Sequence, residues 1–260
     1  MYRPNPLKQR LKEGRRSFGC WLQMGSPIAA EVLAQIGYDF LLIDNEHGPW
    51  TLSESVGLLQ AMGGTPTASV MRVPWNDPVY LKRALDIGVE GVMIPAIDTA
   101  EQAVQAVRAC RYPPHGFRGS AYQVVRAANY GIGADSYRET AADNLVIICQ
   151  VESKQAVDNV DAIAAVEGVD VLLLGPNDLA GTINRLGDLK HPEVMALVER
   201  AERGIKAAGK RLGGIAYGGW SAADMFERGY DMVLANTDMT LMREAALTEI
   251  RAHRARFGAG

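Results

Sequence analysis

Short apolar segments recur along this chain at intervals that fit one repeated structural unit. Eight of them are rich in β-branched and other aliphatic residues and have the length of strands. Their apolar residues are continuous rather than alternating, which is typical of parallel strands covered on both faces. The predicted strands are residues 18–23, 40–44, 67–73, 91–95, 145–152, 171–176, 211–216 and 231–236.

Amphipathic segments separate these strands. Apolar residues three and four positions apart predict helices at 29–37, 53–63, 77–88, 100–110, 154–166, 192–209, 222–229 and 241–257. This alternation predicts a parallel sheet, and eight strand–helix units in 260 residues fit a closed (β/α)8 TIM barrel, a single α/β domain over residues 1–260. The alternative is an open doubly wound sheet. It would need a GxGxxG turn after the first strand, where the sequence reads QMGSPIAA.

Composition narrows the class of partner. The 27 Lys and Arg and 30 Asp and Glu residues give a net charge of −3, so we expect no nucleic-acid partner. No segment reaches the roughly 18 apolar residues of a membrane span, and the N-terminus lacks the apolar core of a signal peptide. Three cysteines without a CxxC pair favour a reducing cytoplasm. The basic stretches 8–16 and 251–258 are expected to be solvated ends.

Polar side chains collect where the predicted strands end. In a parallel barrel all these ends open on one face, and in TIM barrels that face carries the chemistry. Two long connections, 96–144 and 177–210, also follow strand ends. The first contains RYPPHGFRG, which reads equally as a lid or subunit contact and as an irregular surface excursion. The strand-end polar residues are Asp44, Glu46, His47, Arg72, Gln150, Glu152, Asp178, Asn236 and Asp238.

Glu152 and Asp178 lie at the ends of consecutive strands. Two carboxylates held close together repel each other unless one is protonated or a cation lies between them. An oxygen-only pair favours Mg²⁺ or Mn²⁺, with Co²⁺ as a further candidate. The alternative is that each acid only caps the helix that follows it.

The remaining groups suit carbanion chemistry next to a carbonyl. A divalent cation would polarise a chelated 2-oxo acid, and Arg72 could stabilise the enolate oxygen with its fixed set of donors. His47 has a suitable intrinsic pKa for a base, and Gln150, on the same strand face as Glu152, could donate to substrate oxygens. Arg72 could instead only pair with Asp77 or Asp44, and Asp44 lies close enough in sequence to orient His47.

Several multi-residue motifs carry a resemblance to a known family. IDNEHGPW, VPWNDPVYLKRALDIGVEGVMIP, RYPPHGFRG, CQVES and LLLGPNDLA appear in this order. Over residues 18–257 the chain resembles the class II, metal-dependent pyruvate aldolases of the HpcH/HpaI type, which act on 4-hydroxy-2-oxoheptanedioate and 2-keto-3-deoxy sugar acids. The resemblance implies a phosphoenolpyruvate/pyruvate-type barrel and cleavage of 4-hydroxy-2-oxo acids to pyruvate, or hydroxypyruvate, and an aldehyde.

The resemblance also implies site roles and an assembly. Asp86 would raise the basicity of the catalytic histidine across a subunit contact, which leaves Asp44 and Asp86 as two candidates for that role. Members are usually hexamers built from dimers that exchange the C-terminal helix, here about 239–257. The implied roles are His47 as proton acceptor, Arg72 as stabiliser of the transition state, Gln150, Asn177 and Asp178 as pyruvate-binding residues, and Glu152 and Asp178 as metal ligands.

Rival functions make different demands on the sequence. A Schiff-base aldolase needs a desolvated lysine at a strand end, whereas Lys154 begins a helix and Lys210 precedes a strand. A citryl- or malyl-CoA-type lyase needs a basic site for the nucleotide, and no Arg/Lys cluster is evident on a rim loop. A binding protein that has lost turnover would not need both His47 and Arg72. Asn236 and the segment 216–220 depart from the family pattern, so the aldehyde partner stays open.

Overall fold

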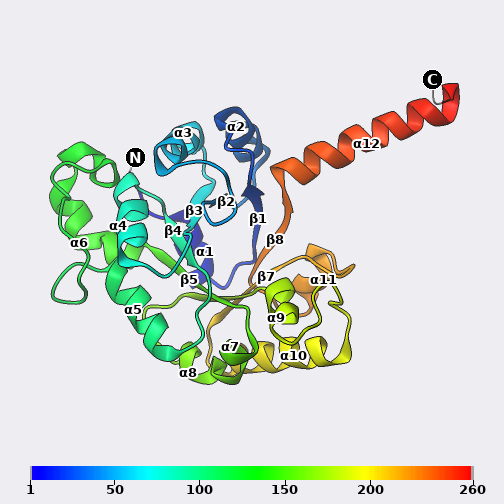
Figure 1. Ribbon diagram of the computed structural model, residues 1–260. Helices are drawn as coiled ribbons and strands as arrows, with labels where there is room; N and C mark the ends of the chain where they lie inside the picture. The colour runs from blue at the N-terminus through cyan, green and yellow to red at the C-terminus, as the bar shows by residue number, and fades with distance from the viewer. Residues whose placement is uncertain (1, 259–260) are drawn as a thin grey trace.

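The eight predicted strands form one closed parallel barrel in the computed structural model, which describes residues 2–258. Each strand pairs with its neighbours in chain order, and β8 closes the barrel against β1 (Figure 1). The (β/α)8 prediction is therefore confirmed and the open doubly wound sheet is wrong. The strands are β1 Ser17–Leu22, β2 Phe40–Asp44, β3 Ala68–Arg72, β4 Gly91–Ile94, β5 Val146–Val151, β6 Val171–Leu174, β7 Arg211–Ile215 and β8 Met232–Thr237.

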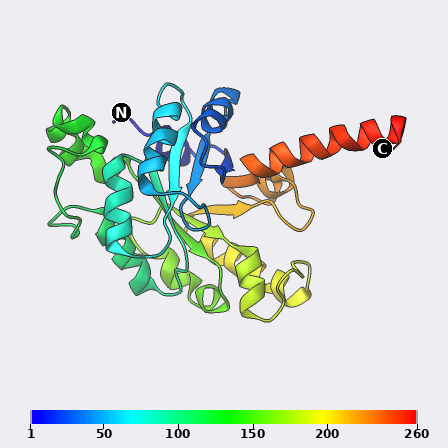
Figure 2. The same ribbon diagram turned by 45° about the horizontal axis from the view of Figure 1, so that its top comes forward.

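Helices surround the barrel, with the strands at the centre of the molecule (Figure 2). Several begin at a residue whose side chain accepts a backbone N–H of the first turn; Thr51 and Thr99 each form a complete capping box. The helices are α1 Pro6–Lys12, α2 Pro27–Ile36, α3 Leu52–Met62, α4 Pro78–Ile87, α5 Ala100–Cys110, the 3₁₀ helix η1 Arg126–Gly131, α6 Ala134–Asn144, α7 Lys154–Asp158, α8 Val160–Ala164, α9 Pro176–Thr182, α10 Pro192–Ala207, α11 Ala222–Glu227 and α12 Asp238–Phe257.

Two apolar cores follow from the alternation of side chains along the strands. Outward-facing residues pack under the helices, and inward-facing residues such as Phe40, Leu42 and Ile148 fill the barrel. Gly19 makes room for this interior packing, because a Cβ there would lie 2.3 Å from the Phe40 ring. The barrel is thus a packed support for its polar end rather than a pore.

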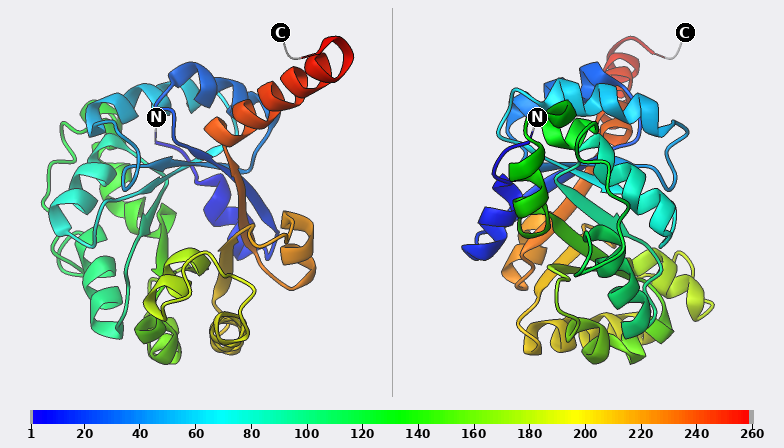
Figure 3. Two further views of the ribbon diagram at one scale, coloured as in Figure 1. Left: turned by 45° about the vertical axis from the view of Figure 1, so that its right-hand side comes forward. Right: turned by 90° about the vertical axis from the view of Figure 1, so that its left-hand side faces the viewer.

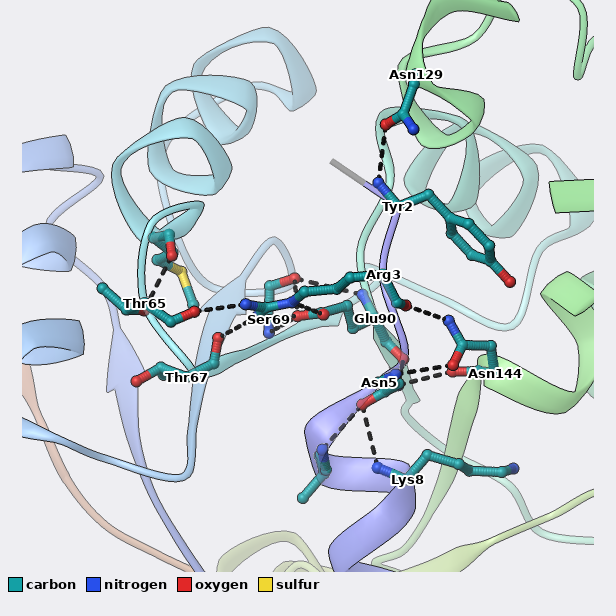
Figure 4. A network of polar contacts seen from close by, with 12 residues as sticks. Tyr2, Arg3, Asn5, Lys8, Thr65, Thr67, Ser69, Glu90, Asn129 and Asn144 are labelled. Atoms are coloured by element: carbon teal, nitrogen blue, oxygen red, sulfur yellow. Dashed lines mark hydrogen bonds and ion pairs between the residues drawn. The ribbon is translucent and has the colours of Figure 1, made fainter. Parts of the chain in front are cut away.

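The N-terminal segment closes the other end of the barrel. Leu7 and Leu11, four residues apart on α1, are buried in the interior core. Asn5 caps α1, and Arg3 forms a 2.7 Å ion pair with Glu90 at the start of β4 (Figure 4). The prediction that 8–16 is a solvated end is wrong for its first part, because the apolar side chains of α1 pack against the interior core of the barrel.

Three other local predictions need correction. The helix predicted at 154–166 breaks at Asn159, whose side chain donates to the Asp98 carbonyl at 2.8 Å. The long connection 96–144 holds a second helix, α6, beyond the one predicted. The C-terminal helix α12 begins a few residues earlier than its periodic pattern and extends away from the barrel (Figure 3). Among residues 2–258, no helix is both long and apolar enough to cross a membrane.

Candidate active site

An aspartate–arginine pair lies at the carboxyl ends of β2 and β3. Asp44 and Arg72 are Cα partners in the β2–β3 register, so their side chains lie next to each other. Nε and Nη2 of Arg72 donate to Oδ1 and Oδ2 of Asp44 at 2.9 and 2.7 Å. Burial works to raise the pKa of Asp44, but the hydrogen bonds and charge of Arg72 outweigh it and hold that pKa below its ordinary value. Asp77, the other proposed partner of Arg72, caps α4 instead.

The loop after β2 brings a second acid to the same arginine. Oε2 of Glu46 lies 2.8 Å from Nη1 of Arg72, although no N–H among residues 2–258 is directed along a hydrogen bond to that buried oxygen. Burial raises the pKa of Glu46, and the charge of Arg72 opposes this shift. His47 is exposed, and its backbone N–H donates to Oδ1 of Asp44 at 3.3 Å. Asp44, which sequence spacing suggested as a partner of the His47 side chain, therefore binds Arg72 and the loop backbone instead.

Strand β5 contributes Gln150 and, just beyond its end, Glu152. Gln150 is 1% exposed, and its Nε2 donates to Oε2 of Glu152 at 2.6 Å. The other carboxylate oxygen accepts the backbone N–H of Ala96 at 2.7 Å. Ala96 has a φ of 52°, in the left-handed region that residues with a side chain rarely occupy, and such strain is concentrated at functional sites. Nothing in the sequence around Ala96 signals this contact.

Gly175, after β6, makes room for the Glu152 carboxylate. A Cβ at this position would lie 2.8 Å from both Cβ and Oε2 of Glu152. Burial raises the pKa of Glu152 to about 7; the Ala96 N–H opposes the shift, and the charges of Glu46 and Asp178 add to it. The acids of the loops that follow β2, β5 and β6 therefore interact at this end of the barrel.

The helix-cap alternatives resolve differently for the two proposed metal ligands. Ser153, not Glu152, caps α7, since its Oγ accepts the Ala156 N–H at 2.9 Å. Asp178 does occupy the first turn of α9, where a carboxylate is favourable, and it is exposed together with Asn177. Glu152 is thus a half-buried acid without a capping role, whereas Asp178 is an exposed acid in a first helical turn.

The donor chemistry of this rim fits a divalent cation. The carboxylates of Asp44, Glu46, Glu152 and Asp178 share it with the guanidinium of Arg72. The buried Oε1 of Gln150 also has no hydrogen-bond partner within residues 2–258. Across that same range, no three His, Cys, Asp or Glu side chains converge into a complete metal cage. An ion held by two carboxylates would keep open positions for substrate and water.

Within a single chain, Asp86 does not lie at this rim. It is near the C-terminal end of α4, and because this helix runs antiparallel to the strands, that end belongs to the opposite side of the barrel. Its Oδ1 accepts from Nη2 of Arg118 at 2.7 Å, and Nη1 of this buried arginine donates to the Tyr137 hydroxyl at 2.9 Å. The chain alone does not bring Asp86 to His47.

Other residues singled out by sequence have structural partners. Lys154 is exposed and pairs with Asp158. Lys210, which precedes β7, donates to the backbone carbonyls of Val166 and Val169, so neither lysine is a desolvated strand-end amine. Asp238 is buried and accepts the backbone N–H groups of Gln23 and Met24 at 2.8 and 3.0 Å. Asp238 thereby anchors the base of α12 to the end of β1.

Comparison with known proteins places this geometry in context. The family model described as "HpcH/HpaI aldolase/citrate lyase" matches residues 17–244. A hydroxypyruvate/pyruvate aldolase from Chromohalobacter salexigens is 41% identical over 96% of this chain and 98% of its own length. A 5-keto-4-deoxy-D-glucarate aldolase from Citrobacter koseri is 41% identical over 93% of each chain. The crystal structure of a family member from Burkholderia cenocepacia aligns with a TM-score of 0.92 at 40% identity, covering 96% of this chain and 99% of that one.

Proposed function

This chain belongs to the HpcH/HpaI aldolase/citrate lyase family and is a carbon–carbon lyase of the aldolase type, and on that premise we propose that it cleaves, or forms, 4-hydroxy-2-oxo acids with the help of a divalent cation. The products of cleavage are pyruvate, or hydroxypyruvate, and an aldehyde. Glu152 and Asp178 would hold the cation. Mg²⁺ and Mn²⁺ suit this oxygen-donor set, and Co²⁺ is a further candidate.

One observation carries the proposal: the acids that interact at this rim carry more negative charge than Arg72 balances. Asp44 already neutralises Arg72 through two hydrogen bonds. Glu46, Glu152 and Asp178 then remain, and the interaction among them contributes to the raised pKa values of both glutamates. Carboxylates that interact in this way are stabilised by a cation or by protonation. A dication would provide this balance at neutral pH.

When bound, the cation would supply a Lewis acid for the keto group of the 2-oxo acid, which would make the neighbouring carbon more acidic. The residues of the chain supply the remaining functions. Arg72 donates to the oxygen on which negative charge develops, because its plane and position are fixed before the substrate arrives. Gln150 and the first-turn backbone of Asn177 and Asp178 hold the carboxylate of pyruvate. His47 accepts the proton of the C4 hydroxyl as the carbon–carbon bond breaks.

The relatives guide the choice of substrate. Their names describe aldolases of hydroxypyruvate or pyruvate and of a keto-deoxy sugar acid, which favours a short 2-oxo acid as the nucleophile. A CoA-thioester lyase stays the alternative within the same fold. The aldehyde would be set by residues of the outer rim.

Assembly would complete the site. Asp86 would reach His47 of a second subunit, since the fold separates the two residues within one chain. The exposed apolar residues of α12, among them Met242 and Ile250, would be covered by exchange of this helix between subunits, and the exposed Ile28 and Val32 of α2 offer a matching apolar face. The expected assembly is a hexamer, a trimer of dimers. The three unpaired, buried cysteines agree with a cytoplasmic location.

A substrate panel tests this function. Purified protein with Mn²⁺ is offered 4-hydroxy-2-oxo acids of varied chain length, and pyruvate release is followed with lactate dehydrogenase. We expect turnover with at least one sugar-acid-derived substrate, and faster cleavage of oxo acids than of CoA thioesters. Borohydride added with pyruvate should leave no covalent adduct. A stable adduct, or thioester cleavage faster than oxo-acid cleavage, would contradict the proposal.

A further inference from the structure

Asp44 has a complete set of hydrogen-bond partners. Besides the two donors of Arg72, its Oδ2 accepts from Nε2 of Gln23 at 2.9 Å, and its Oδ1 accepts from the backbone of Glu46 and His47 at 3.2 and 3.3 Å. The residue is 0% exposed. A carboxylate bound on both oxygens by five donors has one orientation, so it can serve as a fixed point for the groups attached to it.

The guanidinium of Arg72 is fixed in plane as well as in position. Its Cζ lies 4.4 Å from the centre of the Trp21 ring, which is 5% exposed. A cation–π contact removed from water is among the stronger of its kind. The fork from Asp44 holds the Nε–Nη2 edge, and the indole holds the face.

This arrangement leaves one terminal nitrogen of the guanidinium to contact the substrate. Nη1 is the terminal nitrogen that Asp44 does not bind, and its near neighbour is Oε2 of Glu46 at 2.8 Å. Glu46 is less constrained than Asp44, because its oxygen receives no directed N–H from residues 2–258. A substrate oxygen would thus meet Arg72 at Nη1.

We infer that Asp44 is a positioning residue for the proposed reaction: it holds Arg72 so that Nη1 faces the substrate oxygen, and it ties the loop that carries His47 to the same point. The inference rests on the proposed function. Asp44 thus acts on the arginine rather than on the histidine side chain. Asp44 contributes to catalysis through Arg72, so its effect depends on Arg72 being present.

A double-mutant cycle tests this claim. Asp44→Asn should lower kcat for pyruvate release by roughly 10- to 100-fold, with a smaller change in KM, since preorganised donors act mainly in the transition state. In an Arg72→Ala background the same substitution should cost less than about threefold, because residues that act as a unit are not additive. The Mn²⁺ affinity of Asp44→Asn, measured without substrate, should stay within about threefold of the parent protein.

A second variant guards against loss of folding. Gln23→Leu removes one brace of Asp44 and leaves the charge pair intact, and we expect a three- to tenfold loss of kcat, roughly, that also vanishes without Arg72. Asp231→Asn is the matched control: Asp231, just before β8, pairs at 3.1 Å with Arg211, the first residue of β7, at the opposite end of the barrel. It should lower the Tm without lowering kcat.

The outcomes separate the two claims. Turnover of the parent protein with unchanged kcat in both Asp44→Asn and Gln23→Leu overturns the role of Asp44 alone. Equal losses with and without Arg72, or a large loss of Mn²⁺ affinity, also overturn it, because Asp44 would then act on the histidine or on the cation. Absence of oxo-acid cleavage by the parent protein refutes the proposed function and this inference together.

Discussion

Glu152 should make the metal-free protein less stable as the pH rises. Burial raises its pKa from 4.5 to about 7 in the folded chain. A group with a raised pKa binds its proton more tightly in the folded than in the unfolded state, so between these two values the folded state carries more protons. Stability therefore falls as the pH rises from about 4.5 through 7, which is the reverse of an ordinary paired carboxylate.

The structure bounds the size of this effect. The difference of 7 − 4.5 = 2.5 pKa units corresponds, at 1.36 kcal/mol per unit, to a ceiling of about 3.4 kcal/mol. Glu152 keeps some contact with solvent, and neighbouring groups can relax, so we expect about 1–3 kcal/mol. Glu152→Gln keeps the shape without the charge, and rotation of the Gln150 amide would let the new side chain keep both neighbours.

The assay is denaturant unfolding of both proteins at pH 5 and pH 8 in excess EDTA. The free energy of unfolding of Glu152→Gln minus that of the parent should grow by about 1–3 kcal/mol between the two pH values. Glu31→Gln, an exposed acid on α2, is the control and should follow the parent profile. Saturating Mn²⁺ at pH 8 should stabilise the parent and not the variant. Parallel profiles for the parent and Glu152→Gln would refute the buried-acid argument.

Four further outcomes follow from the same site. Arg72→Ala should lower cleavage by roughly 10²- to 10³-fold, as loss of an oxyanion donor does, and a loss below threefold in the pyruvate-release assay would remove it from that role. Excess EDTA should abolish turnover and Mn²⁺, Mg²⁺ or Co²⁺ should restore it; unchanged rates in EDTA speak against a cation. His47→Ala should slow both cleavage and exchange of the pyruvate methyl protons followed by NMR, and normal rates for both would exclude this base. Gly175→Ala should weaken Mn²⁺ binding in titration calorimetry, because its Cβ would displace Glu152; unaltered affinity would show that the loop yields instead.

Much of the fold could be predicted because it depends on local pattern. A strand buried on both faces needs a continuous apolar run, and all eight runs became barrel strands. The same logic placed Gln150 and Glu152 on one face, where they form a 2.6 Å hydrogen bond. Features that depend on contacts with residues distant in the sequence could not be predicted. Leu7 and Leu11 look like part of a charged terminus until the open end of the barrel is known, and the helix break at Asn159 needs the Asp98 carbonyl.

The candidate site shows why the identity of its residues could be predicted better than their partnerships. Sequence spacing places Asp44 three positions from His47, but the side chains of adjacent parallel strands are brought together by register, which no local spacing encodes. The β2–β3 register sets Asp44 directly beside Arg72, and Trp21 then closes over the guanidinium. Because Arg72 neutralises Asp44, the unbalanced negative charge of the rim is that of Glu46, Glu152 and Asp178. The preference for a cation at this end of the barrel therefore follows from how the strands align as much as from which acids the chain contains.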